Sequence, residues 1–209
     1  MTLSFTGVAS AAVAAPANTQ TYDNSAQAGS QTDGHTDFNV MYDFEQSSAA
    51  TVNGNDEAVA TTSRCHDCGA VAVGFQILVV SKQASLHMNN TAFAASSYCA
   101  RCTTLAAAYQ IVYATDSPQL TLGQQLALDN IQTELERMQI DGLSVKRMET
   151  LTGEFADEVV AVLQGGHGTR HASSAPYSPA MPGIGLPMGM TEDTGPVAHL
   201  YVKYKTPKS

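Results

Sequence analysis

Four cysteines in two CxxC pairs are the residues of this chain best suited to chemistry. Cys65 and Cys68 form the first CxxC motif, and Cys99 and Cys102 form the second, 34 residues further along the chain. Together they supply the four thiolates of a tetrahedral structural zinc site. A CxxC pair can also act as a thiol–disulfide redox centre when its first cysteine begins a helix. An even number of cysteines in an exported chain normally forms disulfides. Three interpretations therefore stay open.

The residues around the pairs bear on the choice among these interpretations. Cys65 to Gly69 has the form of a zinc-ribbon knuckle, in which a glycine after the second cysteine relieves a tight turn. The second pair breaks this form, because Thr103 stands in the glycine position. The gap of about 30 residues between the pairs exceeds the usual spacing of a compact zinc motif. As disulfides, the four cysteines allow three connectivities, one within the pairs and two across them.

An internal duplication contains both pairs. Residues 55–81 laid over residues 89–115 give nine identities in 27 positions. After each pair, bulky and small residues alternate with a period of two, which is typical of a strand. We therefore expect strands over 69–80 and 103–114, although the alanines of the second copy also suit a helix. The predicted unit is strand, CxxC turn, strand, and it occurs twice.

A helical pair is predicted behind the duplication. Thr121 and Ser144 are the expected N-caps, and Gly165 the expected stop. The apolar positions at helical spacing are Leu122, Leu126, Ile131, Leu135 and Met138, and then Met148, Leu151, Phe155, Val159 and Val162. The short break between the two runs predicts an antiparallel helical hairpin on the sheet. The fold class expected is thus α+β.

The flanking segments complete the predicted organisation. Residues 1–17 are similar to the end of a secretory signal, and residues 18–37 are polar and indicate a disordered arm. The predicted domain covers residues 38–164. Residues 165–209 form a tail rich in Gly, Pro and Met, in which 197–204 alternates as a strand does. That strand is expected to pair in its own chain or with a second copy.

Charge and hydropathy exclude some classes of function. The net charge is −9, and Lys and Arg are absent before Arg64. A nucleic-acid partner is excluded, because phosphate binding needs clustered basic residues. No run reaches the roughly 18 apolar residues that a transmembrane helix needs. The low charged fraction of 14% is typical of an exported or cell-surface protein. The expected partner is another protein or a cell surface.

The duplicated region also resembles a family of exported, mostly actinobacterial proteins of unknown function. The matching segments are Asn55 to Ala60, Cys65 to Ile77, Asn89 to Ala94, Cys99 to Ile111 and Thr121 to Leu163. The resemblance implies export and a shared fold, and it supplies no activity. Some relatives are similar to domains attached to zinc-metallopeptidase-like membrane proteins, but this chain lacks the metallopeptidase motif.

The sequence as a whole indicates a non-enzymatic structural or interaction protein that is secreted or attached to the cell envelope. In this interpretation Cys65, Cys68, Cys99 and Cys102 form disulfides, no cofactor is bound and no residue is catalytic. The first alternative is a structural zinc-binding module that uses the same four cysteines. The second alternative is a thiol–disulfide oxidoreductase.

Overall fold

The computed structural model describes residues 18–138 and 143–165, together with the backbone of residues 197–205. The predicted signal segment and most of the predicted tail lie outside these residues. The elements in chain order are β1 (Thr19–Ser30), β2 (Thr36–Ser47), β3 (Thr51–Ser63), β4 (Gly69–Ser81), β5 (Ser85–Ser97), β6 (Thr103–Thr115), α1 (Leu122–Met138), α2 (Val145–Leu163) and β7 (Val197–Lys205).

The strands β1 to β6 wind into a short parallel β-solenoid. In the described part of the chain, sheet A has the order β1-β3-β5 and sheet B the order β2-β4-β6-β7. Each rung consists of one strand in sheet A, a turn, and the next strand in sheet B. Rung 1 is β1 with β2, rung 2 is β3 with β4, and rung 3 is β5 with β6. Equivalent strands of successive rungs pair in parallel, so each rung stacks on the one before it.

The predicted fold class, an α+β fold of duplicated strand–CxxC–strand units, is wrong in its strand arrangement. The two strands that flank a CxxC turn do not pair with each other, because β3 and β5 lie in sheet A while β4 and β6 lie in sheet B. Their partners come from neighbouring rungs. Side-chain alternation has a period of two in either arrangement, so the sequence pattern does not separate a hairpin from a solenoid rung.

Within the described residues the strand–turn–strand unit occurs three times, although only rungs 2 and 3 carry a CxxC turn. The prediction of a disordered arm over residues 18–37 is wrong. That segment contains β1 and the start of β2. The side chains of β1 that face inward are small and buried, among them Asn24, Ala26 and Ala28. The intervening residues are polar and exposed. A strand with a small inner face and a polar outer face has little apolar content, which explains why the composition indicated disorder.

Small residues fill the half of the inter-sheet space that lies next to the CxxC turns, whereas Val52, Leu78, Val80 and Val112 form a larger apolar cluster in the other half. Ten buried alanines form one cluster there: Ala26, Ala28, Ala58, Ala60, Ala70, Ala72, Ala92, Ala94, Ala106 and Ala108. Glycine is required at some of these contacts. A Cβ atom on Gly54 would lie 2.8 Å from the side chain of Leu78, and one on Gly74 would lie 2.4 Å from that of Asp56. The sheets therefore pack closely, and at Gly54 and Gly74 the opposing side chains leave no room for a Cβ atom.

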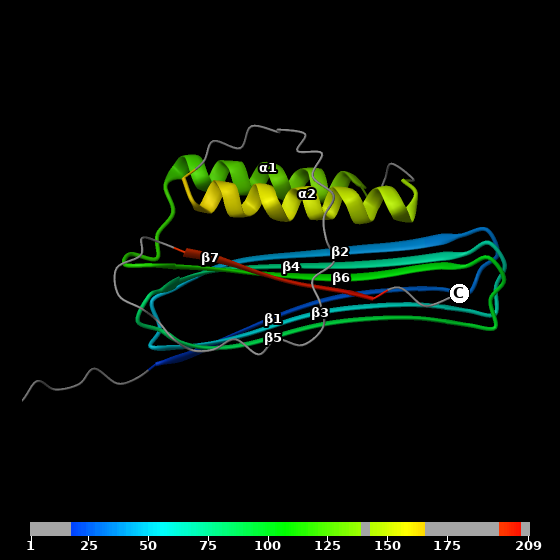
Figure 1. Cartoon of the computed structure of the whole chain (residues 1–209), viewed down its shortest axis with the longest axis horizontal. Helices are drawn as coiled ribbons and strands as arrows, with labels where there is room; N and C mark the ends of the chain where they lie inside the picture. The colour runs from blue at the N-terminus through cyan, green and yellow to red at the C-terminus, as the bar shows by residue number, and fades with distance from the viewer. Residues whose placement is uncertain (1–17, 139–142, 166–196, 206–209) are drawn as a thin grey trace, which may run out of the picture.

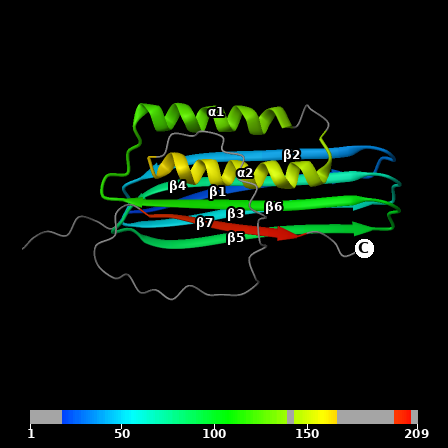
Figure 2. The ribbon, with the colours of Figure 1, turned by 45° about the horizontal axis from the view of Figure 1, so that its top comes forward.

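The opposite face of sheet B is bulky, as the alternation of β4 predicted, and the two helices cover it (Figure 1). Val73, Phe75 and Ile77 from β4 and Tyr109 from β6 pack there with the buried faces of the helices. The rings of Phe75 and Tyr109 stack from one rung to the next, with centroids 4.5 Å apart. The molecule thus has three layers, which are the helices, sheet B and sheet A (Figure 1). The turned view shows α2 lying over the strands of sheet B (Figure 2).

The predicted antiparallel pair of helices is confirmed. The side-chain amide of Gln124 near the start of α1 donates to the carbonyls of Val162 and Leu163 at the end of α2. The apolar stripe of the first helix was expected to face the sheet along its whole length, which is wrong at its start, because Leu122 and Leu126 are 71% and 54% exposed. Among the helices that the structure describes, none has the length and apolar character needed to cross a bilayer.

Both ends of the solenoid are partly closed. The predicted terminal strand is confirmed as β7, which pairs antiparallel with β6 of the same chain and closes that edge of sheet B. At the other end, side chains of β2 bond to the edge of β1. The backbone N–H of Gly29 donates to Asp37 at 2.7 Å, and the Asn39 amide donates to the carbonyl of Gln27 at 2.9 Å. These bonds satisfy backbone groups of an edge strand.

Candidate metal centre

The four cysteines lie in the turns that lead from sheet A to sheet B, directly after β3 and β5. Cys65 and Cys68 lie in the turn of rung 2, and Cys99 and Cys102 in the turn of rung 3. The parallel register continues through these turns, where His66 and Ala100 form a further parallel bridge. The offset of 34 residues seen in the sequence therefore places one CxxC turn directly against the other.

The two turns have left-handed residues at equivalent positions. The residue before each cysteine has a left-handed φ, at 55° for Arg64 and 54° for Asp67 in rung 2, and at 52° for Tyr98 and 56° for Arg101 in rung 3. A left-handed non-glycine residue is uncommon, and four at equivalent positions indicate one turn structure built twice. This conformation brings the two cysteines of each turn towards each other.

Backbone hydrogen bonds hold the two turns in register. The N–H of Asp67 donates to the carbonyl of Ala100 at 3.0 Å, and the N–H of Ala100 donates to the carbonyl of Cys65 at 3.3 Å. The N–H of Thr103 donates to the carbonyl of Cys68 at 3.0 Å. The spacing of the cysteine side chains is thus fixed by the same ladder that pairs the strands.

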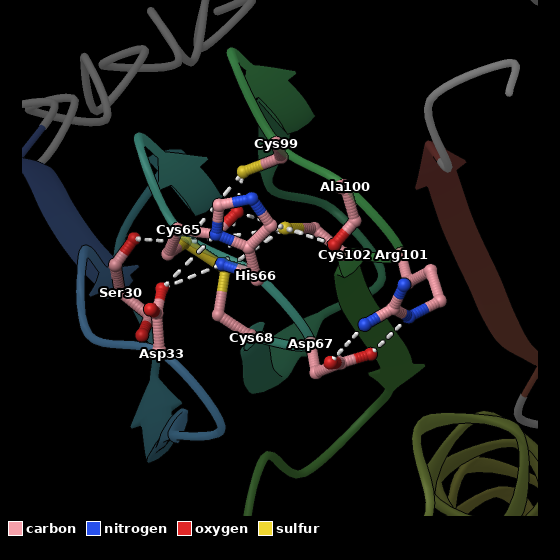
Figure 3. A network of polar contacts seen from close by, with 10 residues as sticks. All are labelled: Ser30, Asp33, Cys65, His66, Asp67, Cys68, Cys99, Ala100, Arg101 and Cys102. Carbon is pink, nitrogen blue, oxygen red and sulfur yellow. Dashed lines mark hydrogen bonds and ion pairs between the residues drawn. A yellow bond between two sulfur atoms is a disulfide. The ribbon is translucent and has the colours of Figure 1, made fainter.

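The four sulfur atoms form a compact cluster, in which all lie within 4.8 Å of one another (Figure 3). Cys65 and Cys68 form a disulfide, while Cys99 and Cys102 are free thiols. From Cys65, the Sγ–Sγ distances are 3.6 Å to Cys99 and 3.9 Å to Cys102. From Cys68 they are 3.8 Å to Cys99 and 3.0 Å to Cys102. The predicted site residues are therefore brought together, all four of them.

The two pairs differ in exposure. Cys65 and Cys68 in rung 2, the inner pair, are buried, whereas Cys99 and Cys102 in rung 3, the outer pair, are half-buried. Burial raises the pKa of the Cys99 thiol, but hydrogen bonds from Cys102, Thr62 and nearby backbone outweigh this effect, and the net pKa lies below its ordinary value. Burial and the hydrogen bond to Cys99 raise the pKa of Cys102. The first thiol of the outer pair is thus the more acidic one.

Charged side chains at the surface also pair between rungs. The guanidinium of Arg101 contacts the carboxylate of Asp67 through two nitrogens, one of them at 2.6 Å. This hydrogen bond is the main reason why the pKa of Asp67 lies below its ordinary value. Between rungs 1 and 2, the backbone N–H of His66 donates to the carboxylate of Asp33 at 2.7 Å. Rung 1 has no cysteine, and its turn contributes this carboxylate.

Gly69 has a different role from the one predicted. Its backbone does not adopt the left-handed conformation, since those residues precede the cysteines. A Cβ atom at this position would lie 2.6 Å from the Oγ1 atom of Thr36 in the rung below. Glycine is therefore required by rung stacking. Thr103 replaces it in rung 3, although the same turn is formed there.

A polar row inside the solenoid, buried at Asn24 and Asp56 and half-buried at Asn90, was not predicted. Asn24, Asp56 and Asn90 occupy equivalent positions in the three rungs. The amide of Asn24 donates to Asp56 Oδ1 at 2.9 Å, while Asp56 Oδ2 has no hydrogen-bond partner among the described residues. Burial raises the pKa of Asp56 to about 7. The alternation of the strand could have revealed this, because Asp56 lies at an even-numbered position on the same inward face of β3 as Ala58 and Ala60.

The oxidoreductase alternative required a helix after the CxxC pair. The structure has a strand there in both copies, with β4 beginning at Gly69 and β6 at Thr103. The helix N-terminus that lowers the pKa of a catalytic cysteine is thus missing from this part of the chain.

Comparisons with known proteins give this chain no relative. No family model matches it, and neither does any curated protein or any solved structure. The resemblance to exported actinobacterial proteins therefore remains a prediction.

Proposed function

We propose that this protein is a non-enzymatic structural or interaction module, a short β-solenoid in which a zinc ion bound by four thiolates joins rungs 2 and 3. The ligands are Cys65, Cys68, Cys99 and Cys102 in their reduced form. The observation that carries the proposal is the position of the four sulfur atoms, which lie within 4.8 Å of one another in the two CxxC turns.

The sulfur spacing supports a tetrahedral site. With Zn–S bonds of about 2.3 Å, four thiolates around zinc stand about 3.8 Å apart. Three of the four distances between the turns are 3.6, 3.9 and 3.8 Å, and the fourth is 3.0 Å. Binding requires reduction of the Cys65–Cys68 disulfide and a movement of these two sulfurs away from each other. Adjustments of this size lie within the reach of χ1 rotations in the two turns.

The surroundings of the sulfurs support the same proposal. The hydrogen bonds that lower the pKa of Cys99 come partly from the backbone of Cys65 and Ser97. Such bonds stabilise a thiolate and orient it, as groups around metal ligands commonly do. A zinc ion at this position would link two rungs across a loop of about 30 residues, which restricts the unfolded chain.

The experiment is metal analysis of the full-length chain after reduction. We expect one zinc per chain, and cobalt(II) in its place should give the absorption of a tetrahedral tetrathiolate. Cys102→Ser should lose the metal. His66→Ala is the matched control, because it changes another potential ligand in the same turn and should keep one zinc. A reduced chain with four alkylatable thiols that takes up no zinc contradicts the proposal.

A second candidate rests on the Cys65–Cys68 disulfide itself. In an oxidising compartment, such as the exported location predicted from composition, both pairs would close and the module would bind no metal. Intact mass after alkylation under denaturing, non-reducing conditions separates the candidates. Four blocked cysteines in protein from its native host support the disulfide form, and four alkylated cysteines with one zinc support the metal form.

A further inference from the structure

We infer that the four-cysteine cluster is a redox switch, which exchanges its zinc ion for two disulfides, each closed within one CxxC turn. The inference rests on the proposed zinc site and adds its regulation. Three features of the cluster carry it, and these are the capacity of each turn to close, the exposure of the outer pair, and the contacts between the pairs.

Each turn can close on its own. The rung 2 turn already holds the Cys65–Cys68 disulfide, with Cα atoms 6.0 Å apart, within the range of ordinary disulfides. The rung 3 turn has left-handed residues at the equivalent two positions, with φ values that match within a few degrees. Cys99 and Cys102 thus have the same backbone framework, and an equivalent disulfide needs no rearrangement of the strands.

The outer pair is the entry point for an oxidant. Cys99 and Cys102 are half-buried, whereas Cys65 and Cys68 are buried. A hydroperoxide therefore reaches the outer pair first. Cys102 lies 3.0 Å and Cys99 3.8 Å from Cys68 Sγ, so a disulfide formed in the outer pair can pass inward by thiol–disulfide exchange. The structure has a Cys65–Cys68 disulfide beside the free thiols of Cys99 and Cys102. This arrangement corresponds to the half-oxidised intermediate of the proposed reaction.

The overall reaction balances with two molecules of hydrogen peroxide. In each turn two thiolates lose two electrons and form one S–S bond. One hydrogen peroxide accepts these electrons and two protons from solvent, and its O–O bond breaks to give two waters. After the second turn has reacted, all four ligands are disulfide sulfurs and Zn²⁺ is released. Reduction by a dithiol reverses both steps.

The two end states hold rungs 2 and 3 together differently. Zinc bonds to both turns, whereas each disulfide joins residues of one turn only. In the oxidised form the two turns are still joined by backbone hydrogen bonds, such as the one from the N–H of Asp67 to the carbonyl of Ala100. The exposed ion pair between Asp67 and Arg101 also remains. Oxidation should therefore loosen rung 3 against rung 2.

The chain is well suited to a direct test, because trypsin cuts between the cysteines. Cleavage after Arg64, Lys82, Arg101 and Arg137 gives peptide 65–82 with the inner pair, peptide 83–101 with Cys99, and a third peptide that begins at Cys102. The full-length, zinc-loaded chain is titrated with hydrogen peroxide. Zinc release is followed with a metallochromic dye, and the product is digested without reduction.

We expect one zinc released for every two peroxides, and zinc uptake restored by dithiothreitol. Peptide 65–82 should be lighter by two hydrogens, and peptide 83–101 should be linked to the peptide that begins at Cys102. Backbone amides of β5 should exchange roughly tenfold faster in the oxidised form than in the zinc form. His66→Ala should behave like the wild-type chain in all of these measurements.

The failures of the two proposals are distinguishable. A reduced chain that takes up no zinc refutes the proposed function, and the switch with it. A chain that binds zinc but retains it under peroxide, with its thiols intact, refutes the switch alone. A link between peptide 65–82 and either outer peptide also refutes the switch, because a disulfide across the turns would lock the rungs together.

Discussion

Replacement of the buried carboxyl group of Asp56 by an amide should stabilise this protein at neutral and alkaline pH. Asp56 is 0% exposed between the two sheets, and burial raises its pKa from 3.8 to about 7. The equivalent residues of rungs 1 and 3 are Asn24 and Asn90. Asp56→Asn therefore gives all three rungs the same amide in a space that already holds a side chain of this shape.

The magnitude follows from proton linkage. The folded state has the higher pKa and binds the proton more tightly, so the free energy of unfolding falls as the pH rises from about 4 to about 7. A shift of about three units at about 1.4 kcal/mol per unit amounts to about 4 kcal/mol. The penalty is absent below pH 4 and complete above pH 7. Asn carries no charge, so Asp56→Asn should remove the penalty.

Urea unfolding followed by circular dichroism, at several pH values between 4 and 8.5, measures this effect. The variant and the wild type should be about equally stable at pH 4, and the variant about 4 kcal/mol more stable at pH 8. The difference between the two proteins is the relevant quantity, because burial also raises the pKa of Asp43, Glu45 and Asp157. Glu57→Gln, the same exchange of a carboxyl group for an amide on the outward side of β3, is the matched control. An advantage of Asp56→Asn that does not change with pH would refute the reasoning.

Substitutions at three further positions test the packing and the helices by the same urea assay. Gly74→Ala should destabilise the chain by about 1–3 kcal/mol, because its Cβ would lie 2.4 Å from Asp56 Oδ1. Gly123→Ala in α1 should stabilise it by about 0.5–1 kcal/mol, since nothing lies within 4 Å of the added Cβ and alanine favours a helix; a loss of stability would contradict this. Ser144→Ala should cost about 1 kcal/mol, because Ser144 accepts a hydrogen bond from the N–H of Arg147 at the start of α2. Ser144→Asp, which keeps an acceptor, should retain most of that stability.

The strength of local signals decided which parts of the fold could be predicted. The bulky and small faces of β4 are confirmed, because alternation is a property of each strand by itself. The helices are confirmed for a similar reason, together with their N-caps at Thr121 and Ser144. Leu122 and Leu126 were assigned to the core wrongly, because helical spacing alone does not tell how far along a helix the sheet extends.

The first rung shows why other parts of the fold could not be predicted. Its strands are offset from those of rung 2 by 32 and 33 residues, against 34 for the next step, and its turn has no cysteines. Identity at a fixed offset therefore revealed two copies and missed the third. The polar outer face of β1 then made the segment similar in composition to a disordered arm.

For the candidate site, the sequence determined the four cysteines and their equivalence. The duplication at a constant offset implied that Cys65 corresponds to Cys99 and Cys68 to Cys102. The distances between the pairs came only from the tertiary structure, since parallel stacking places equivalent residues of neighbouring rungs one strand spacing apart. An arrangement as separate hairpins would have kept the same sequence pattern without bringing the two turns together.

The sequence by itself thus determined the strand faces, the helices and the chemistry available to the cysteines, because these depend on residues close together in the chain. The tertiary structure decided which strands pair, which turns meet and which carboxyl group is buried. These depend on contacts between residues more than 30 positions apart. Asp56 is the clearest example, because burial between the two sheets raises its pKa and no local pattern describes that burial.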